Sequence, residues 1–472
     1  MNWIDLTIFG IYFIIILGIG FYFYYKNKNK EDYYVGGRKI SASHVGLSIV
    51  ATDVGGGFSI GLGGLGFLMG LSGSWLLFTG LVGAWLAAVT IVPHVKKLDN
   101  EHKFLTYPEF LKHRYNAKVA LVASIISGIG YLGFTSAQIL AGAKLAAGSV
   151  FAHFTWIDPL TFALYVMAGV VMMYTVLGGL KAVIYTDTVQ WIVLFTGLLF
   201  IGIPAAYVEV GGWSEIRATL PPEYFTLTNV SWWQIVNWFV TIIPIWFIAM
   251  TLYQRIYACP TVKDAKKAFF MAGLLEYPLM AFIGVILGLM ARVVFPNAEA
   301  EMAMPMLLRD ALPVGVTGVV LAAYFSAIMS TADSCLIASS ANWVQDIIQP
   351  MTSDKLKPKT NMIISQVVTL IIGLLALLLA TRFTMVLDII LYAYAFMVSG
   401  LLVPTLAGYY YRKSHPTAAF ASMIAGGGLT LTLLATNAKL PYNLDASLFG
   451  IITSLVVFLV STFIINVHQR ND

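Results

Sequence analysis

The sequence predicts an all-α membrane protein of about thirteen transmembrane helices, and three observations support this. The chain has 472 residues, of which 59% are hydrophobic and only 11% are charged. Its mean hydropathy of +0.81 is more than the surface of a water-soluble domain could carry. Thirteen apolar stretches, each close to the roughly 20 residues that cross a bilayer, follow one another along the chain. We therefore expect residues 1–472 to form a single integral membrane domain, with the lipid bilayer as its solvent.

The apolar stretches define the expected elements in chain order. The first, Leu6 to Tyr25, has no charge and lacks the basic start and small-residue cleavage site of a signal peptide, so we expect a retained helix. The thirteen stretches begin near Leu6, Ala42, Trp75, Leu121, Leu160, Val189, Trp233, Ala268, Val314, Met362, Phe383, Ala418 and Leu448.

The basic residues predict the orientation. Lys and Arg near helix ends resist translocation and collect in cytoplasmic loops. If the N-terminus is outside and the C-terminus inside, the cytoplasmic segments hold 22 of the 28 Lys and Arg. These segments begin at Lys26, Lys96, Lys181, Arg255, Asp346 and Arg412, with Arg470 in the tail. This distribution explains the net charge of +5, so no nucleic-acid partner is expected. A multi-pass protein of the bacterial inner membrane fits this pattern.

The second stretch contains residues that disfavour a regular membrane helix. Asp53 and the consecutive glycines Gly55 to Gly57 fall near its middle. A glycine costs about 1 kcal/mol of helix propensity relative to alanine, and a central aspartate costs about 2.5 to 3.5 kcal/mol on insertion scales. Irregular backbone at this depth must be packed in protein or line a wet cavity, where freed carbonyls can bind a cation. The glycines alone could instead be a packing surface, but an acid within the membrane favours a functional site.

The ninth stretch places hydroxyl groups on one helical face. Ala327, Ser330, Thr331 and Ser334 follow the i, i+3, i+4, i+7 spacing, and Asp333 adds a charge beside them. Hydroxyl and carbonyl oxygens on one face suit sodium, a hard cation. Alternatively, each hydroxyl bonds only to a carbonyl of its own helix. The aspartate needs a partner in either case, a bound cation or a basic side chain.

A third polar segment begins the sixth stretch at its cytoplasmic end. Gly178 and Gly179 stop the preceding helix, and Thr186 with Asp187 then enter the next one. An acid near a helix N-terminus is stabilised by the helix dipole. Asp187 could therefore cap the helix or lie on a route by which a cation leaves.

These segments together resemble the solute/sodium symporter family, which includes bacterial proline, galactose, sialic acid and pantothenate carriers and animal glucose and choline carriers. The resemblance is carried by Tyr34–Arg38, Ala51–Ser59, Gly178–Gln190, Gln254–Arg255 and Ser326–Ser340. It implies the leucine-transporter fold, with inverted five-helix repeats over spans two to six (41–208) and seven to eleven (232–411). An additional helix (1–30) would precede the repeats, and two helices (416–467) would follow.

The resemblance also implies binding sites. The family's common sodium site would use the oxygens of Ala51, Val54, Ala327, Ser330 and Thr331. A second sodium site, as in the sialic acid carriers, would add Asp333, Ser334 and Asp187 to Ser330. Asp53 matches an acid associated with sodium coupling in the proline carrier, and Asp187 matches an acid on the inner exit route.

The substrate pocket is expected at the broken second span. The residues expected to line it are Gly55, Phe58, Phe134, Gln138, Trp246 and Ala249. The choline carriers place tryptophans where this chain has Asp53 and Ala249, so the aromatic cage for a quaternary ammonium group is depleted. Asp53 beside aromatic residues favours a zwitterion or amine, such as proline.

The sequence thus predicts a sodium-coupled secondary active symporter that imports a small polar solute. A proton-coupled carrier of the same fold and an organic-cation symporter are the alternatives, while a membrane sensor would need no net transport. A membrane enzyme would require an acid–base pair or a metal cluster at one membrane face, and the sequence has neither pattern. The charged residues Lys144 and Glu276 fall within predicted spans without an assigned role, and the oligomeric state stays open.

Overall fold

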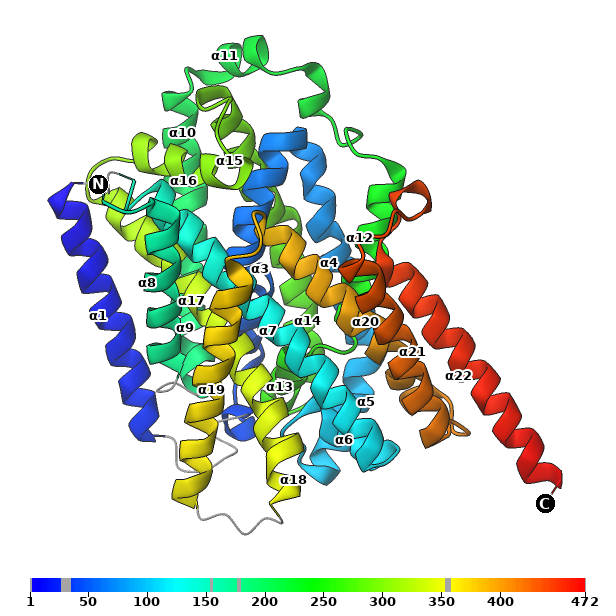
Figure 1. The fold of residues 1–472 in the computed structure, drawn as a ribbon. Helices are drawn as coiled ribbons and strands as arrows, with labels where there is room; N and C mark the ends of the chain where they lie inside the picture. The colour runs from blue at the N-terminus through cyan, green and yellow to red at the C-terminus, as the bar shows by residue number, and fades with distance from the viewer. Residues whose placement is uncertain (1, 27–34, 153–155, 176–179, 353–357, 472) are drawn as a thin grey trace.

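The computed structural model describes residues 2–26, 35–152, 156–175, 180–352 and 358–471. Every regular element within these ranges is a helix, which confirms the all-α prediction. Figure 1 shows the helices packed into one bundle, with the N-terminal end of α1 at its upper left and the C-terminal end of α22 at its lower right. Tyr34, Gly178 and Gly179 of the sequence motifs lie outside the described residues.

A helix or helix pair lies at each of the thirteen predicted positions. They are α1 (Trp3–Lys26), α3 (Ala42–Met69), α4 (Trp75–Val89), α7 (Ala117–Gly148), α8 (Pro159–Thr175), α9 (Leu180–Gly197) with α10 (Ile203–Glu209), α12 (Trp232–Ile245) with α13 (Met250–Ala258), α14 (Val262–Leu274) with α15 (Ala281–Val294), α17 (Val316–Trp343), α19 (Pro358–Ala380), α20 (Val386–Tyr410), α21 (Pro416–Ala435) and α22 (Ala446–Asn471). In the described ranges nine helices are long and apolar enough to cross a membrane, or ten if α12 and α13 form one span.

Short helices occupy the two ends of the bundle (Figure 1). The upper end has α11 (Gly212–Thr219) and α16 (Ala300–Ala311), and the lower end has α5 (Ile91–His102), α6 (Tyr107–Arg114) and α18 (Gln349–Met351). A capping box between Thr106 and Glu109 starts α6. The Thr106 side chain accepts a hydrogen bond from the backbone N–H of Glu109, and the Glu109 side chain accepts one from the backbone N–H of Thr106.

Helix α17 forms the centre of the bundle. The most apolar window of the span that contains it is 100% buried, whereas the corresponding window of α22 is only 22% buried. Helix α17 packs against α7, α9, α3 and α1. The hydroxyl-bearing segment predicted to bind a cation is therefore enclosed by protein, and α22 has the exposed apolar surface that suits lipid.

Helix α3 is broken where the sequence predicted. Gly55 has φ 31° and ψ −157°, a conformation that requires glycine. The N–H of Gly57, just beyond the break, donates to the Gln138 side chain of α7 at 3.0 Å. An interhelical bond thus satisfies a backbone donor at the break, as a buried irregular segment requires.

A second break, which was not predicted, separates α12 from α13. Their axes differ by 45°, and residues 246–249 join them. Pro244 lies within the last turn of α12 and was the available sequence signal, because a proline removes a backbone donor and disturbs the preceding turn.

Candidate cation-binding site

The break in α3 and the centre of α17 bring four of the predicted sodium ligands together. The Thr331 hydroxyl lies 3.0 Å from the carbonyl oxygen of Ala51, across the two helices, and 3.0 Å from that of Ala327. The Ser330 hydroxyl donates to the Ala327 carbonyl at 3.2 Å. Val54, the fifth predicted ligand, is buried directly before the break.

The glycines at the break allow this close approach. A Cβ added to Gly55 would collide with the hydroxyl of Thr331, and one added to Gly56 would collide with the side chain of Ile328. The glycines are a packing surface for α17, and Gly55 also supplies the backbone conformation that breaks α3.

The chemistry of this site suits a hard monovalent cation. Its donors are main-chain carbonyl and hydroxyl oxygens, and none of the five predicted ligands supplies nitrogen, sulfur or a formal charge. The Ser330 hydroxyl bonds a carbonyl of its own helix, whereas the Thr331 hydroxyl lies within 3.0 Å of one carbonyl on each of the two helices. A sodium ion could be held by the carbonyls of Ala51, Val54 and Ala327 and by these two hydroxyls.

A second polar cluster surrounds Asp187 of α9. Its carboxylate accepts a hydrogen bond of 2.6 Å from Ser48 of α3 and forms an ion pair of 3.5 Å with Arg255 of α13. Ser330 of the predicted sodium site lies near this carboxylate. Asp187 therefore binds side chains of α3 and α13, which goes beyond a capping role.

Arg255 is placed differently from the prediction. It was counted as the first residue of a cytoplasmic segment, but its side chain is fully buried within the bundle. It donates to Ser48 at 3.1 Å and to Ser334 at 3.4 Å, and it also bonds Thr52. Hydropathy cannot separate a basic residue at a helix end from one that turns inward to a buried acid.

Asp333, the remaining member of the predicted second site, is also fully enclosed. Its Oδ1 accepts a hydrogen bond from Thr175 of α8, while its Oδ2 has no hydrogen-bond partner in the described part of the chain. Ser334 contacts Arg255 instead. The structure thus places Ser334 and Asp187 beside Arg255 and pairs Asp333 with Thr175.

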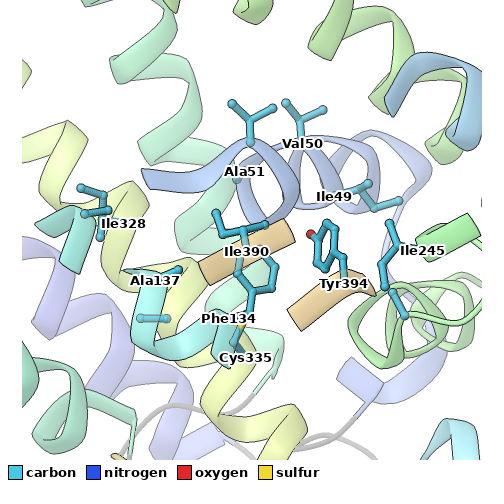
Figure 2. Packing of buried hydrophobic residues seen from close by; sticks show 14 of the residues in the cluster. Ile49, Val50, Ala51, Phe134, Ala137, Ile245, Ile328, Cys335, Ile390 and Tyr394 are labelled. Carbon is cyan, nitrogen blue, oxygen red and sulfur yellow. The ribbon is translucent and has the colours of Figure 1, made fainter. Parts of the chain in front are cut away.

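The predicted substrate residues divide into two groups. Asp53 is half-buried and receives a hydrogen bond from Tyr394 of α20. The Tyr394 ring lies edge-to-face against Phe134 of α7, with 5.4 Å between ring centroids. Figure 2 shows these two rings next to one another, on the side of α3 that carries Ile49. Gln138, on the same face of α7 as Phe134, reaches the break through Gly57, and its Nε2 has no partner among the described residues.

The other group lies at the second break. Trp246 packs against Phe269 with their rings edge-to-face, and a Cβ on Gly83 would collide with the indole. Ala249 is buried at the start of α13. The side chain of Phe58 lies outside the described part of the structure. Tyr394 was not predicted as a site residue, since an aromatic residue in an apolar helix has no distinctive spacing.

Lys144 of α7 belongs to an ionic cluster beside α16, a helix at the upper end of the bundle in Figure 1. It is buried and pairs with Glu299 and, at 2.7 Å, with Glu301 of α16. The Glu301 carboxylate also accepts from the backbone N–H groups of Val386 at 2.9 Å and Leu387 at 3.3 Å. The cluster therefore joins α7, α16 and the start of α20, and Lys144 turns inward instead of reaching the membrane surface.

A corresponding ionic cluster lies at the lower end. Asp99 of α5 pairs with Arg38 and, at 2.8 Å, with Lys96, whose ammonium also donates to the carbonyl of Tyr257 at 3.1 Å. Burial lowers the pKa of Lys96, and the charge of Asp99 partly offsets this effect. The cluster ties the segment before α3 to α5 and to the end of α13.

Comparison with known proteins places this geometry in context. A model of the sodium:solute symporter family matches residues 33–426. The high-affinity proline transporter PutP of Bacillus subtilis (strain 168) is 26% identical over 461 residues, which cover 94% of each chain. A sodium/glucose cotransporter of Vibrio parahaemolyticus is 25% identical over 97% of this chain and 90% of its own. The solved structure of a Na⁺-coupled sialic acid symporter aligns over 98% of both chains with a TM-score of 0.79 and 20% sequence identity, so the fold is shared.

Proposed function

The chain belongs to the sodium:solute symporter family, whose members are secondary transporters and not enzymes, and on this premise we propose that it imports an amino acid or similar zwitterion, such as proline, with sodium. Import would follow alternating access across the bacterial inner membrane. The observation that carries the proposal is the Thr331 hydroxyl at 3.0 Å from the Ala51 carbonyl, because it brings an oxygen of the broken helix to the oxygens of α17.

The coupling mechanism follows from this geometry. Sodium bound between Ala51, Val54, Ala327, Ser330 and Thr331 ties α3 to α17 and stabilises whichever conformation keeps these oxygens together. Each sodium that crosses inward gains about 2.3 kcal/mol per 100 mV of membrane potential. Release to the cytoplasm passes Asp187, which the Ser330 hydroxyl already contacts.

The proposed topology has thirteen spans, an outer N-terminus and an inner C-terminus, with inverted repeats over 41–208 and 232–411. The two helix breaks support the repeats. The broken α3 is the first helix of the first repeat, and the bent pair α12–α13 is the first helix of the second. Broken helices at corresponding positions are the usual mark of a transporter binding site near the bilayer centre.

The proposed substrate follows from the charges around the first break. Asp53 offers a carboxylate to an ammonium group, and the unpaired Nε2 of Gln138 offers a donor to a carboxylate. The rings of Phe134 and Tyr394 add an apolar face that suits a pyrrolidine or aliphatic side chain. PutP, a proline transporter, and the glucose cotransporter have similar identities to this chain, so the choice between the two solutes rests on Asp53 and Gln138.

A second sodium ion is proposed near Asp187 and Asp333, with Ser330 and Ser334 as neutral ligands. Each carboxylate has one oxygen without a partner among the described residues. The Arg255 guanidinium now holds the other oxygen of Asp187, so binding of this ion would require Arg255 to give up that contact.

The test is thermal unfolding of the purified protein in sodium or potassium chloride at one pH, followed by a panel of proline, choline and glucose in each salt. Ligands that bind the folded state raise its melting temperature. We expect sodium alone to raise it and proline to raise it further only when sodium is present. Proteoliposomes should then accumulate labelled proline when given an inward sodium gradient.

Equal melting temperatures in the two salts, with no sodium-driven uptake, would contradict sodium coupling. A sodium response that only glucose or choline enhances would retain the coupling and overturn the assignment of a zwitterion.

A further inference from the structure

Glu276 is a buried acid to which the proposed transport cycle gives no role. It lies in the π-helical turn Leu275–Met280 that joins α14 to α15, inside a predicted span. Its side chain has no solvent exposure, and neither carboxylate oxygen has a hydrogen-bond partner in the described ranges. Most buried carboxylates are paired or bonded, so this one needs an explanation.

Among the described residues, no basic side chain forms an ion pair or hydrogen bond with Glu276. Its turn packs against α4 and α3 in addition to α14 and α15. On α4, a Cβ added to Gly80 would lie only 2.6 Å from Oε2, and α4 carries no titratable side chain. On α3, Asp53 is close enough for its charge to act on Glu276. The other titratable residues of these elements are His44 of α3, Tyr277 beside Glu276, Lys263, Asp264, Lys266 and Lys267 in the first turns of α14, and Arg292 near the end of α15.

The distribution of these groups determines the charge state of Glu276. The four charged residues of α14 precede Glu276 by nine or more positions, and Arg292 follows it by sixteen. Arg292 instead lies over the ring of Phe67. Two ionised carboxylates facing each other inside a membrane, without a cation, are among the costliest arrangements in a protein. A proton removes one of the charges and needs no additional space.

The helix is interrupted next to Glu276. Tyr277, the next residue, precedes Pro278 and has φ −134° and ψ 119°, the extended conformation that a residue before proline favours. The proline thus accounts for the bend directly after Glu276. Asp53, whose charge acts on Glu276, keeps partial exposure while its neighbours Thr52 and Val54 are buried. Glu276 thus lies at a bend in its own span and near the partly exposed acid of the broken helix.

We propose that Glu276 is a proton-binding site of this carrier, holding a proton in the conformation seen here and exchanging it with water when the transport cycle opens the break in α3. The proposal rests on the proposed function, because that cycle supplies the opening. On binding, a hydronium ion gives up a proton and an O–H bond forms on a Glu276 carboxylate oxygen. On release, that bond breaks and the proton returns to water.

The first experiment compares Glu276→Gln with the wild type and with Glu209→Gln, a control at an exposed acid near the end of α10. Thermal unfolding is followed from about pH 6 to about pH 9, the range in which buried glutamates titrate. A rise in pH removes the proton from Glu276 and leaves two facing carboxylates. We therefore expect the melting temperature of the wild type and the control to fall by a few degrees more than that of Glu276→Gln. Parallel curves for all three proteins would overturn the proposal.

The second experiment measures proton movement in proteoliposomes that contain a pH-sensitive dye, while sodium drives proline uptake. Wild type and Glu209→Gln should change the internal pH during uptake, and Glu276→Gln should take up proline without that change. A dye response that survives in Glu276→Gln would overturn the proposal.

If Glu276→Gln does not fold, infrared difference spectroscopy of the wild type still tests the site. Addition of sodium and proline should shift or remove the C=O band of a protonated carboxylic acid, and an unchanged band would count against proton exchange. The sodium-dependent rise in the wild-type melting temperature distinguishes a failure of the proton-binding proposal from a failure of the proposed function. If it is present, sodium coupling stands whatever Glu276 does; if it is absent, the proposed function fails independently.

Discussion

Replacement of Thr331 by valine tests the sodium site most directly. The side chain keeps its shape and loses its hydroxyl, which lies 3.0 Å from the carbonyl oxygens of both Ala51 and Ala327. A hydroxyl has one proton and two acceptor positions, so in the ion-bound state its oxygen can turn towards sodium. The variant therefore removes one of five predicted ligands and the hydroxyl bond that joins α17 to the Ala51 carbonyl at the α3 break.

The size of the effect follows from the strength of one oxygen contact. A bond to a charged partner contributes about 1.5 to 3 kcal/mol, and each 1.4 kcal/mol changes affinity about tenfold. We therefore expect Thr331→Val to raise the dissociation constant for sodium by about 10- to 150-fold. At a sodium concentration of about 100 times the wild-type dissociation constant, the stabilisation by sodium would fall from about 2.7 kcal/mol to about 1.4 kcal/mol or less.

The assay is the melting temperature as a function of sodium concentration at constant ionic strength. Thr79→Val is the matched control, because Thr79 is equally buried but its hydroxyl donates only to Leu76 within α4, at 2.5 Å. A control that matches the wild-type sodium curve shows that a lost helix-internal hydroxyl does not affect sodium. A Thr331→Val curve that also matches the wild type would refute the assignment of this site.

Four further results are expected. Ser330→Ala should weaken the sodium-dependent rise in melting temperature by a smaller factor than Thr331→Val, as a sodium titration would measure. The control Ser124→Ala loses only a bond of 2.8 Å to the Ala120 carbonyl and should keep the wild-type sodium response. Gly55→Ala should leave the protein folded and abolish sodium-driven uptake; normal uptake would contradict this expectation. The positive φ of Gly55 and the collision of an added Cβ with Thr331 cost about 1 to 3 kcal/mol at the α3–α17 contact. Lys144→Met should lower the free energy of unfolding by about 3 to 5 kcal/mol, because Glu301 would stay buried without the Lys144 ammonium group. An unchanged melting temperature would show that this ion pair contributes little to stability. Burial raises the pKa of Asp445, in the loop before α22, from 3.8 to about 6. Its stabilising contribution is therefore complete below pH 3.8 and is lost as the pH rises through about 6. Asp445→Asn should make the melting temperature depend less on pH over this range.

Local patterns were sufficient where one helix contains the whole signal. The helical spacing of Ala327, Ser330 and Thr331 predicted a shared face, and in the structure both hydroxyls lie next to the Ala327 carbonyl. The consecutive glycines after Asp53 predicted a break, which the backbone of Gly55 confirms. Both inferences depend on the regular geometry of a helix and on the special conformations of glycine, which are properties of short segments.

Long-range partners were not predictable in the same way. Arg255 and Asp187 are 68 positions apart, and only the packing of α13 against the bundle brings them together. The same holds for Lys144 with Glu301, and for Tyr394 with Asp53. A charge pattern records how many basic residues lie near helix ends but not which of them turn inward.

The sequence by itself determined the membrane class, the positions of the helices, the break in α3 and the residues that offer oxygen to a cation, because hydropathy and helical periodicity are local and the bilayer imposes them on every span. Only the tertiary structure decided that Thr331 meets Ala51, that Arg255 occupies the space beside Asp187 and that Glu276 is buried near Asp53 with no hydrogen-bond partner among the described residues. Those contacts depend on how helices distant in the sequence pack side by side, and that packing follows from the complementary shapes of their surfaces.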